Sequence, residues 1–268
     1  MTLPALTKDL FSLAGRTALI TGGSRGIGKM IAQGFLEMGA TVYISSRKAQ
    51  ACIEAAEELS AFGTCIPLPG DVSSVDGVKA LAAAYGAKEQ TLDILVNNAG
   101  AAWLAPFDDF PEKGWDKVMD VNVKGVFFLT QALVGHLRAA AKASGRPAKV
   151  INVASVDGLF VNPQETYSYG ASKAAVIMLT RRMALKLAPD NVLVSGIAPG
   201  AFASEMNVAA RDHGDAMSKN IPTGRIGADA DMAGAAIYLA SKAGDYVAGA
   251  VVTVDGGVTL INASASMD

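Results

Sequence analysis

Short apolar runs alternate with longer amphipathic stretches along most of this chain. Seven apolar, β-branched runs predict strands near residues 17–21, 41–45, 64–69, 92–96, 148–154, 191–197 and 250–254. Six stretches with helical periodicity predict helices near residues 26–38, 48–61, 75–85, 112–140, 167–188 and 229–241. Runs that are apolar almost throughout are typical of strands buried on both faces. The alternation therefore predicts an α/β fold with a doubly wound parallel sheet of about seven strands and helices on both faces.

The chain has 268 residues and shows no internal repeat, low-complexity tract or interdomain linker. We interpret residues 1–13 as an N-terminal extension and residues 14–268 as a single domain, since α/β domains often reach this size.

Composition and charge narrow the possible partners. Hydrophobic residues make up 51% of the chain, but we find neither an apolar run of the ~18 residues that span a bilayer nor a secretory leader. We therefore expect a soluble, cytoplasmic protein without membrane partners. The net charge of −2 and the mixed distribution of charges argue against nucleic acid. The two cysteines, Cys52 and Cys65, and the two histidines lack the spacing of a metal site, so no metal is expected.

A glycine-rich turn follows the first predicted strand. The segment from Thr21 to Gly28 reads Thr-Gly-Gly-Ser-Arg-Gly-Ile-Gly and opens a predicted helix. Glycines let the backbone approach a pyrophosphate, and the free amides and dipole of a helix N-terminus attract its charge. The order of strand, turn and helix indicates dinucleotide binding, although the glycine spacing differs from the usual G-x-G-x-x-G.

Tyr169 and Lys173 are four residues apart in a predicted helix, so their side chains share one face. An ammonium group beside a phenol stabilises the phenolate and makes the tyrosine a better proton donor to a carbonyl oxygen. Ser155 lies at the end of a predicted strand 14 residues earlier. The Tyr-x-x-x-Lys pair alone also occurs on ordinary solvated helices, so it gains weight only from the other motifs.

Together the motifs resemble the short-chain dehydrogenase/reductase family over about residues 14–258. The resemblance rests on the Thr21–Gly28 pattern together with Asn97-Asn98-Ala99-Gly100, Asn122, Ser155, Tyr169, Lys173 and Pro199-Gly200. It implies a single Rossmann-like domain that binds a dinucleotide and catalyses oxidation or reduction between CH–OH and C=O. By the same resemblance, Ser155 binds the substrate carbonyl and Tyr169 protonates it. Lys173 binds the nicotinamide ribose and lowers the pKa of the tyrosine, and Asn122 holds a water that leads to solvent.

The second strand end bears on the choice of cofactor. Enzymes that use NAD usually place a carboxylate there, whereas this chain has Ser46 and Arg47. Arg47, Arg25 in the glycine turn and the Ser46 hydroxyl could bind a 2′-phosphate, which favours NADPH/NADP⁺. Alternatively, Arg47 simply opens a solvated helix. With the positions that the family resemblance adds, the expected cofactor-binding residues are Gly22, Ser24, Arg25, Gly26, Ile27, Gly28, Ser46, Arg47, Asp71, Val72, Asn98, Ala99, Gly100, Tyr169, Lys173, Pro199, Gly200, Phe202 and Ser204.

Substrate identity is less constrained by the sequence. Trp103, Leu104 and the run Leu159–Val161 could form an apolar wall, and the stretch after Gly200 up to Lys219 is interpreted as a lid. Within the family, the chain resembles bacterial 3-oxoacyl reductases of the rhamnolipid-synthesis type. The leading hypothesis is an NADPH-dependent reductase of 3-oxoacyl thioesters, linked to acyl carrier protein or to coenzyme A. A reductase or dehydrogenase of another small alcohol or ketone, such as a sugar acid or cyclic ketone, and a non-catalytic NADP-binding regulator remain alternatives.

Two expectations concern assembly and docking. The resemblance implies a homotetramer, or at least a dimer, with twofold interfaces formed by the 112–140 region and by the last strand. Lys142, Arg146 and Lys149 cluster around the start of the fifth predicted strand and could attract an acidic carrier, or they could belong to an ordinary solvated loop.

Overall fold

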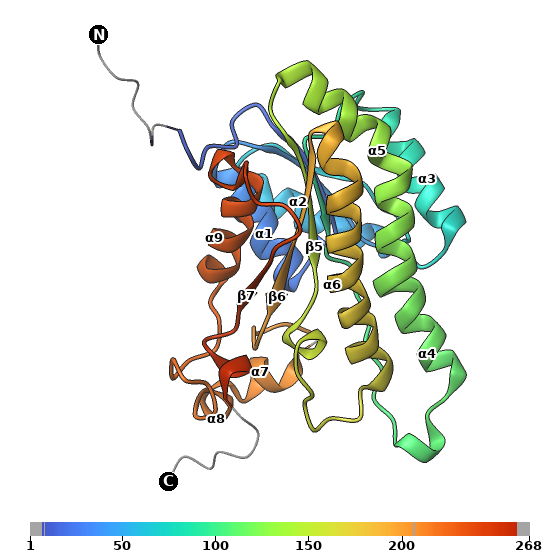
Figure 1. Cartoon of the computed structure of the whole chain (residues 1–268), viewed down its shortest axis with the longest axis vertical. Coiled ribbons are helices and arrows are strands. Elements are labelled where there is room, and N and C mark those ends of the chain that lie inside the picture. The colour runs from blue at the N-terminus through green and yellow to red at the C-terminus, as the bar shows by residue number, and fades with distance from the viewer. Residues whose placement is uncertain (1–6, 8, 206, 262–268) are drawn as a thin grey trace.

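The sheet has seven strands in the order β3-β2-β1-β4-β5-β6-β7, and every neighbouring pair is parallel. The computed structural model describes residues 7, 9–205 and 207–261 (Figure 1). The strands are β1 (Thr17–Thr21), β2 (Thr41–Ser45), β3 (Cys65–Pro67), β4 (Ile94–Asn97), β5 (Ala148–Val153), β6 (Val192–Pro199) and β7 (Val251–Val254). The predicted doubly wound parallel sheet is confirmed, and each strand lies within about three residues of its predicted position.

Helices cover both faces of this sheet (Figure 1). One apolar core holds the inward side chains of α1 (Gly26–Glu37), α2 (Ala49–Leu59) and α9 (Asp229–Ala240). The other holds those of α3 (Val75–Gly86), α5 (Gly125–Ser144) and α6 (Tyr167–Leu187). The shorter helical elements are η1 (Phe107–Asp109), α4 (Glu112–Met119), η2 (Asp120–Lys124), η3 (Val156–Gly158), η4 (Ala188–Asp190), α7 (Val208–Asp212), α8 (Gly214–Ser218), η5 (Lys242–Gly244) and η6 (Val258–Leu260).

The helix predicted over residues 112–140 is longer and less regular than expected. It runs from Glu112 to Ser144 as α4, a π-helical turn η2 and α5. With 33 residues and a mean hydropathy of 1.2 in its most apolar window, it could cross a membrane by length and composition alone. The sequence estimate missed this, because it considered only uninterrupted apolar runs. Leu129, Leu133 and Leu137 pack into the second core, so burial in the domain explains part of that apolar character.

Residues before the first strand pack against the domain. Leu13 is fully buried, and the Leu10 carbonyl accepts a hydrogen bond of 3.2 Å from the Ala243 amide. At least the end of the predicted extension 1–13 is therefore held in place, while residues 1–6 and 8 lie outside the described part of the chain.

Parallel pairing brings the carboxyl ends of the strands to one edge of the sheet. Thr21 pairs with Ser45, and Asn97 pairs with Asn152, which aligns the segments that follow β1, β2, β4 and β5. The loops after β4, β5 and β6 gather at the lower end of the molecule in Figure 1. The predicted site residues follow these strand ends, so the fold places them along a common edge.

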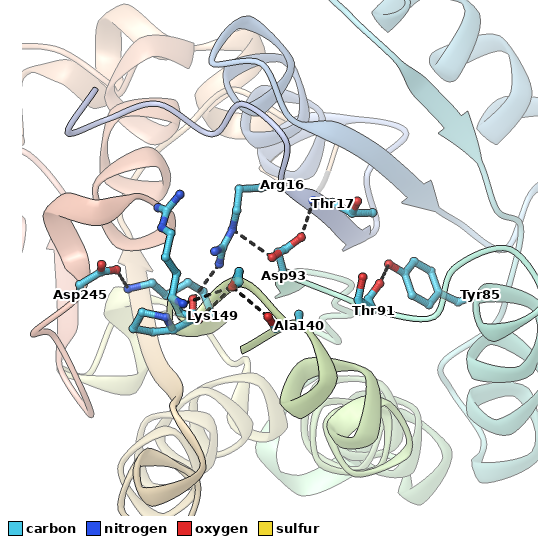
Figure 2. A network of polar contacts seen from close by, with 11 residues as sticks. Arg16, Thr17, Tyr85, Thr91, Asp93, Ala140, Lys149 and Asp245 are labelled. Carbon is cyan, nitrogen blue, oxygen red and sulfur yellow. Dashed lines mark hydrogen bonds and ion pairs between the residues drawn. The ribbon is translucent and has the colours of Figure 1, made fainter. Parts of the chain in front are cut away.

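The opposite edge of the sheet carries a network of charged side chains (Figure 2). Arg16 and Asp93 form an ion pair with 3.2 Å between Nε and Oδ1. Lys149 lies 2.8 Å from a carboxylate oxygen of Asp245 and donates a 2.9 Å hydrogen bond to the Gly244 carbonyl. Both cations are almost fully buried, and burial lowers the pKa of each. The network ties the beginnings of β1, β4 and β5 to the segment before β7.

This arrangement removes Lys149 from the predicted basic docking patch. Lys149 is only 2% exposed and already paired with Asp245, so it is not available to a carrier protein. Lys142 in the last turn of α5 and Arg146 just after that helix precede β5, so both lie toward the amino ends of the strands, away from the edge with the site residues. The docking prediction was wrong for Lys149, because sequence alone did not show that this side chain points into the protein, and for Lys142 and Arg146 it stays a prediction.

Candidate active site

Tyr169 and Lys173 lie in the first turns of α6, directly beside the end of β5. The Lys173 ammonium is 5.5 Å from the centroid of the Tyr169 ring and donates a 2.8 Å hydrogen bond to the Val153 carbonyl. Ser155 follows β5, and its hydroxyl hydrogen-bonds with Tyr169. Ser155 and Lys173 are 7% and 5% exposed. The structure therefore brings the three predicted residues together in a sheltered place at the sheet edge.

Burial shifts both titrating groups. It raises the pKa of Tyr169 to about 12, and Asp157 adds to this rise, whereas the hydrogen bond with Ser155 lowers the pKa. Burial lowers the pKa of Lys173 to about 8, against a raising effect of the Asp157 charge. When no cofactor is bound, half of the Lys173 side chains are neutral at about pH 8. The binding of an anionic or hydroxyl-bearing cofactor is therefore sensitive to the protonation of this lysine.

We expect dinucleotide affinity to fall as the pH rises through about 8, because Lys173 then loses the positive charge and one donor. In the unfolded chain Lys173 keeps its proton to a higher pH than in the folded protein. The contribution of this group to folding stability therefore rises as the pH increases above about 8, while cofactor binding weakens. Fluorescence titration of NADPH from pH 6.5 to 9.5 measures the affinity. Lys173→Arg, whose guanidinium does not titrate in this range, should remove the break. Constant affinity of the unmodified protein across this range contradicts the role.

Asn122 lies in the π-helical turn η2, and its side-chain amide forms three hydrogen bonds with protein groups. The oxygen accepts a 2.8 Å bond from the Ala101 amide, and the nitrogen donates to the Ala101 carbonyl and to Ser172 Oγ, each at 2.9 Å. The side chain therefore fixes the loop after β4 to helix α6. Both N–H donors of the amide are used, so a water held by this residue, as the sequence led us to expect, would have to bind its backbone or the second lone pair of its side-chain oxygen.

The glycine turn has the shape of an anion cradle. Gly22 and Gly26 have positive φ angles of 66° and 51°, and a Cβ on Gly28 would lie 2.3 Å from the Gly22 carbonyl oxygen. Asn98 donates from Nδ2 to the Thr21 and Gly22 carbonyls at 2.9 and 3.2 Å, which holds the turn against the end of β4. No side chain caps α1, and its first turn has no acidic residue. Its leading amides thus remain available to a pyrophosphate, and the cradle fits a dinucleotide.

The predicted cations lie at two places around this turn. Arg47 lies two residues after the end of β2, is exposed and forms no ion pair within the described residues. The Ser46 hydroxyl donates a 3.2 Å hydrogen bond to the Lys48 carbonyl. Arg25 is the residue before α1 and forms an ion pair with Glu205. Arg47 is therefore free to bind a 2′-phosphate, whereas Arg25 already has a partner.

The remaining predicted cofactor residues line the same edge. Ser24 and Ile27 are half-buried in the turn. The amide of Ala99, which precedes Gly100, donates a 3.0 Å hydrogen bond to Thr21 Oγ1. After β3, Val72 is buried and exposed Asp71 accepts a 2.9 Å bond from the Ser73 amide.

The segment after β6 differs more from expectation. Gly200 packs closely against Asp255, and a Cβ there would lie 2.8 Å from the Asp255 Cα. The Phe202 ring is 2% exposed and packs on Gly227 in the core, so any contact of Phe202 with a nicotinamide would have to come from its backbone. Ser204 lies against Gly26, since a Cβ on that glycine would be 3.2 Å from Ser204 Cβ. Pro199 ends β6.

Sequence reasoning missed several residues that shape the site. Asp157 acts electrostatically on Tyr169 and Lys173, and its place two residues after Ser155 was the available signal. Glu165 joins two loops by accepting bonds from the Phe107 amide at 3.2 Å and the Tyr167 hydroxyl at 3.1 Å. Nothing local in the sequence indicated that clasp. In the described part of the chain, no group of three or more His, Cys, Asp or Glu residues could hold a metal ion.

Comparisons with known proteins agree with this geometry. A family model described as short chain dehydrogenase matches residues 16–215. The chain belongs to the short-chain dehydrogenase family. It is therefore an oxidoreductase, and the resemblance inferred from its motifs is confirmed.

This short-chain dehydrogenase is similar to several characterised proteins over nearly its whole length. It is 48% identical to the rhamnolipids biosynthesis 3-oxoacyl-[acyl-carrier-protein] reductase of Pseudomonas aeruginosa, over 93% of this chain and 98% of that protein. The solved RhlG/NADP active-site complex of that species superposes with a TM-score of 0.90 at 48% identity, covering 94% and 99% of the two chains. Gluconate 5-dehydrogenase of Gluconobacter oxydans is 38% identical over 94% of this chain and 98% of that protein.

Proposed function

We propose that the protein is an NADPH-dependent reductase that converts 3-oxoacyl thioesters to 3-hydroxyacyl thioesters. The observation that carries the reaction type is the contact between Ser155, Tyr169 and Lys173 beside the glycine turn. NADPH, when bound, supplies the hydride. The similarity to a reductase solved with NADP supports the cofactor, and Arg47 supports the 2′-phosphate.

The residues of this chain divide the remaining work. The Ser155 hydroxyl hydrogen-bonds the carbonyl oxygen and orients it toward Tyr169. Tyr169 donates its proton to that oxygen as negative charge develops there, and the Lys173 ammonium stabilises the phenolate that remains. The Asn122 amide holds α6 and the loop after β4 in one arrangement, so the phenol stays in place. In the reverse direction the phenolate accepts the proton from an alcohol.

A group of exposed apolar side chains near the site, here called the apolar rim, supports the assignment of an acyl substrate. The segments that follow β4 and β5, up to the first residue of α6, expose large apolar side chains, namely Leu104, Phe107, Leu159, Val161 and Tyr167. The Phe107 and Tyr167 rings meet edge to face at 5.5 Å, and Phe110 contacts Tyr167 in the same manner at 5.7 Å. Tyr167 is the first residue of α6, so the rim lies at the same end of that helix as Tyr169 and Lys173. Exposed apolar groups beside a reaction centre gain free energy when they cover an acyl chain, but gain little from a polyol.

A substrate panel with both cofactors tests this proposal. We expect kcat/KM with NADPH to rise at least about tenfold between 3-oxobutyryl and 3-oxodecanoyl thioesters, since burying a methylene contributes about 0.8 kcal/mol. Phe107→Ala should remove much of this gain and leave the short substrate nearly unchanged. Phe62→Ala, an exposed phenylalanine after α2, is the matched control. Equal activity on all chain lengths, or an unchanged gain in Phe107→Ala, contradicts the acyl assignment.

A sugar-acid oxidoreductase is the second candidate, favoured by the 38% identity to gluconate 5-dehydrogenase. The same panel distinguishes it. Faster turnover of 5-ketogluconate or gluconate than of any 3-oxoacyl thioester would select this function and still leave the roles of Tyr169 and Lys173 intact.

Assembly into a homotetramer in the cytoplasm is part of the proposal. Large apolar side chains remain exposed on the two long helices, including Phe127 on α5, in the region expected to form an interface, and Met178 and Leu185 on α6. Such a face gains stability when a second copy covers it by twofold symmetry. Light scattering at micromolar concentration should give a mass near four chains, and a monomer would contradict it.

A further inference from the structure

Glu205 places a negative charge beside the cradle that must receive an anionic dinucleotide. It follows β6 at the start of the segment that covers the glycine turn, and its carboxylate forms an ion pair with Arg25. Ser204, its neighbour, lies against Gly26 of that turn. The side chains of Arg25 and Glu205 are 63% and 57% exposed, so phosphate groups in solution can reach the pair.

We infer that Glu205 competes with the 2′-phosphate of NADPH for Arg25 and thereby sets how strongly the protein prefers NADPH over NADH. The inference rests on the proposed NADPH-dependent function, but it concerns a residue that function does not need. Arg25 is the residue immediately before α1, whose uncapped first turn forms the anion cradle. A carboxylate on this arginine occupies the donors that a phosphate at the cradle would otherwise use.

The relative strengths decide the direction of the exchange. A solvent-exposed ion pair contributes little, because water and salt screen it, so the carboxylate is a weak partner that yields to a ligand. A phosphate dianion offers more charge and paired acceptor oxygens to a guanidinium, so it replaces the carboxylate. The pair nevertheless has to be broken when NADPH binds, and breaking it reduces the apparent affinity. NADH lacks the 2′-phosphate, so it gains nothing from the exchange and leaves the pair intact.

Glu205→Gln keeps the size of the side chain and removes its charge. We expect NADPH to bind about three- to fivefold more tightly and NADH to change by less than about 1.5-fold, in line with the strength of an exposed ion pair. The gain for NADPH should shrink in 0.5 M salt. Glu58→Gln is the matched control. Glu58 on α2 is 67% exposed and pairs with Lys29 of α1, the helix that begins directly after Arg25.

The Arg25→Ala background separates competition from simple repulsion. If Glu205 acts through Arg25, Glu205→Gln gives no gain there. A gain that persists without Arg25 overturns the inference, and so does an unchanged NADPH affinity of the single variant. An equal gain for both cofactors also overturns it, since it would place the competition at the pyrophosphate. Arg25→Ala alone tests the proposed cofactor use: a selective loss of NADPH affinity supports that use even when Glu205 proves neutral. Isothermal titration of the intact protein with each cofactor supplies all these affinities.

Discussion

Tyr169→Phe should lower the kcat for reduction by about 10² to 10⁴ while NADPH affinity changes less than about twofold. The ring still fills its place beside Lys173, so the cofactor pocket keeps its shape, but no proton remains to be donated to the carbonyl oxygen. Stopped-flow reduction at saturating NADPH measures the chemical step, and fluorescence titration measures the affinity.

Tyr167→Phe is the matched control, because it deletes a second phenol only two residues away. That hydroxyl bonds to Glu165 and lies at the loop clasp, so we expect less than about a threefold change in kcat. If Tyr169→Phe retains more than about a tenth of kcat, another group supplies the proton. Loss of activity in both variants to the same extent would also argue against a specific acid, since it would point to the loop.

Periodicity and turn composition were enough to predict the sheet. The strands from Thr17 to Thr21 and from Ala148 to Val153 are buried along nearly their whole length, so their apolar runs carry a strong signal. The π-helical turn at Asp120–Lys124 could not be predicted this way, because the insertion shifts the hydrogen bonds without breaking the helical pattern. The burial of Lys149 was also hidden, because its partner Asp245 lies far along the chain.

The site followed from strand ends and side-chain spacing where the contacts are local. The Tyr169–Lys173 pair needed only helical geometry, and the glycine turn needed only its place between β1 and α1. Long-range packing determined the rest. The Asn122 amide donates hydrogen bonds to Ala101 and Ser172, and the Phe202 ring packs in the core against Gly227. The local sequence indicates neither contact. Motif resemblance therefore located these positions without showing which atoms of each residue remain available.

Arg47→Asp should lower the ratio of kcat/KM for NADPH to that for NADH by about 10² or more. Arg47 is exposed at the end of β2, where a dinucleotide extends its adenosine ribose, and it has no ion-pair partner among the described residues. A charge-assisted hydrogen bond contributes about 1.5–3 kcal/mol, which corresponds to roughly 10- to 100-fold, and a carboxylate in the same place adds repulsion of the phosphate. The new carboxylate can also accept a hydrogen bond from the 2′-hydroxyl of NADH, so kcat/KM should rise for NADH as it falls for NADPH.

Lys48→Asp makes the same charge change one residue later and serves as the control. Its effect on the ratio should stay below about fivefold, because a charge that only faces solvent is screened. Initial rates with both cofactors, at matched ionic strength and with one 3-oxoacyl substrate, give the two ratios. Should Arg47→Asp leave the ratio unchanged while Arg25→Ala lowers it, the glycine turn alone would bind the 2′-phosphate. If neither variant moves the ratio, the exposed end of β2 has no part in cofactor choice and the preference for NADPH loses its structural support.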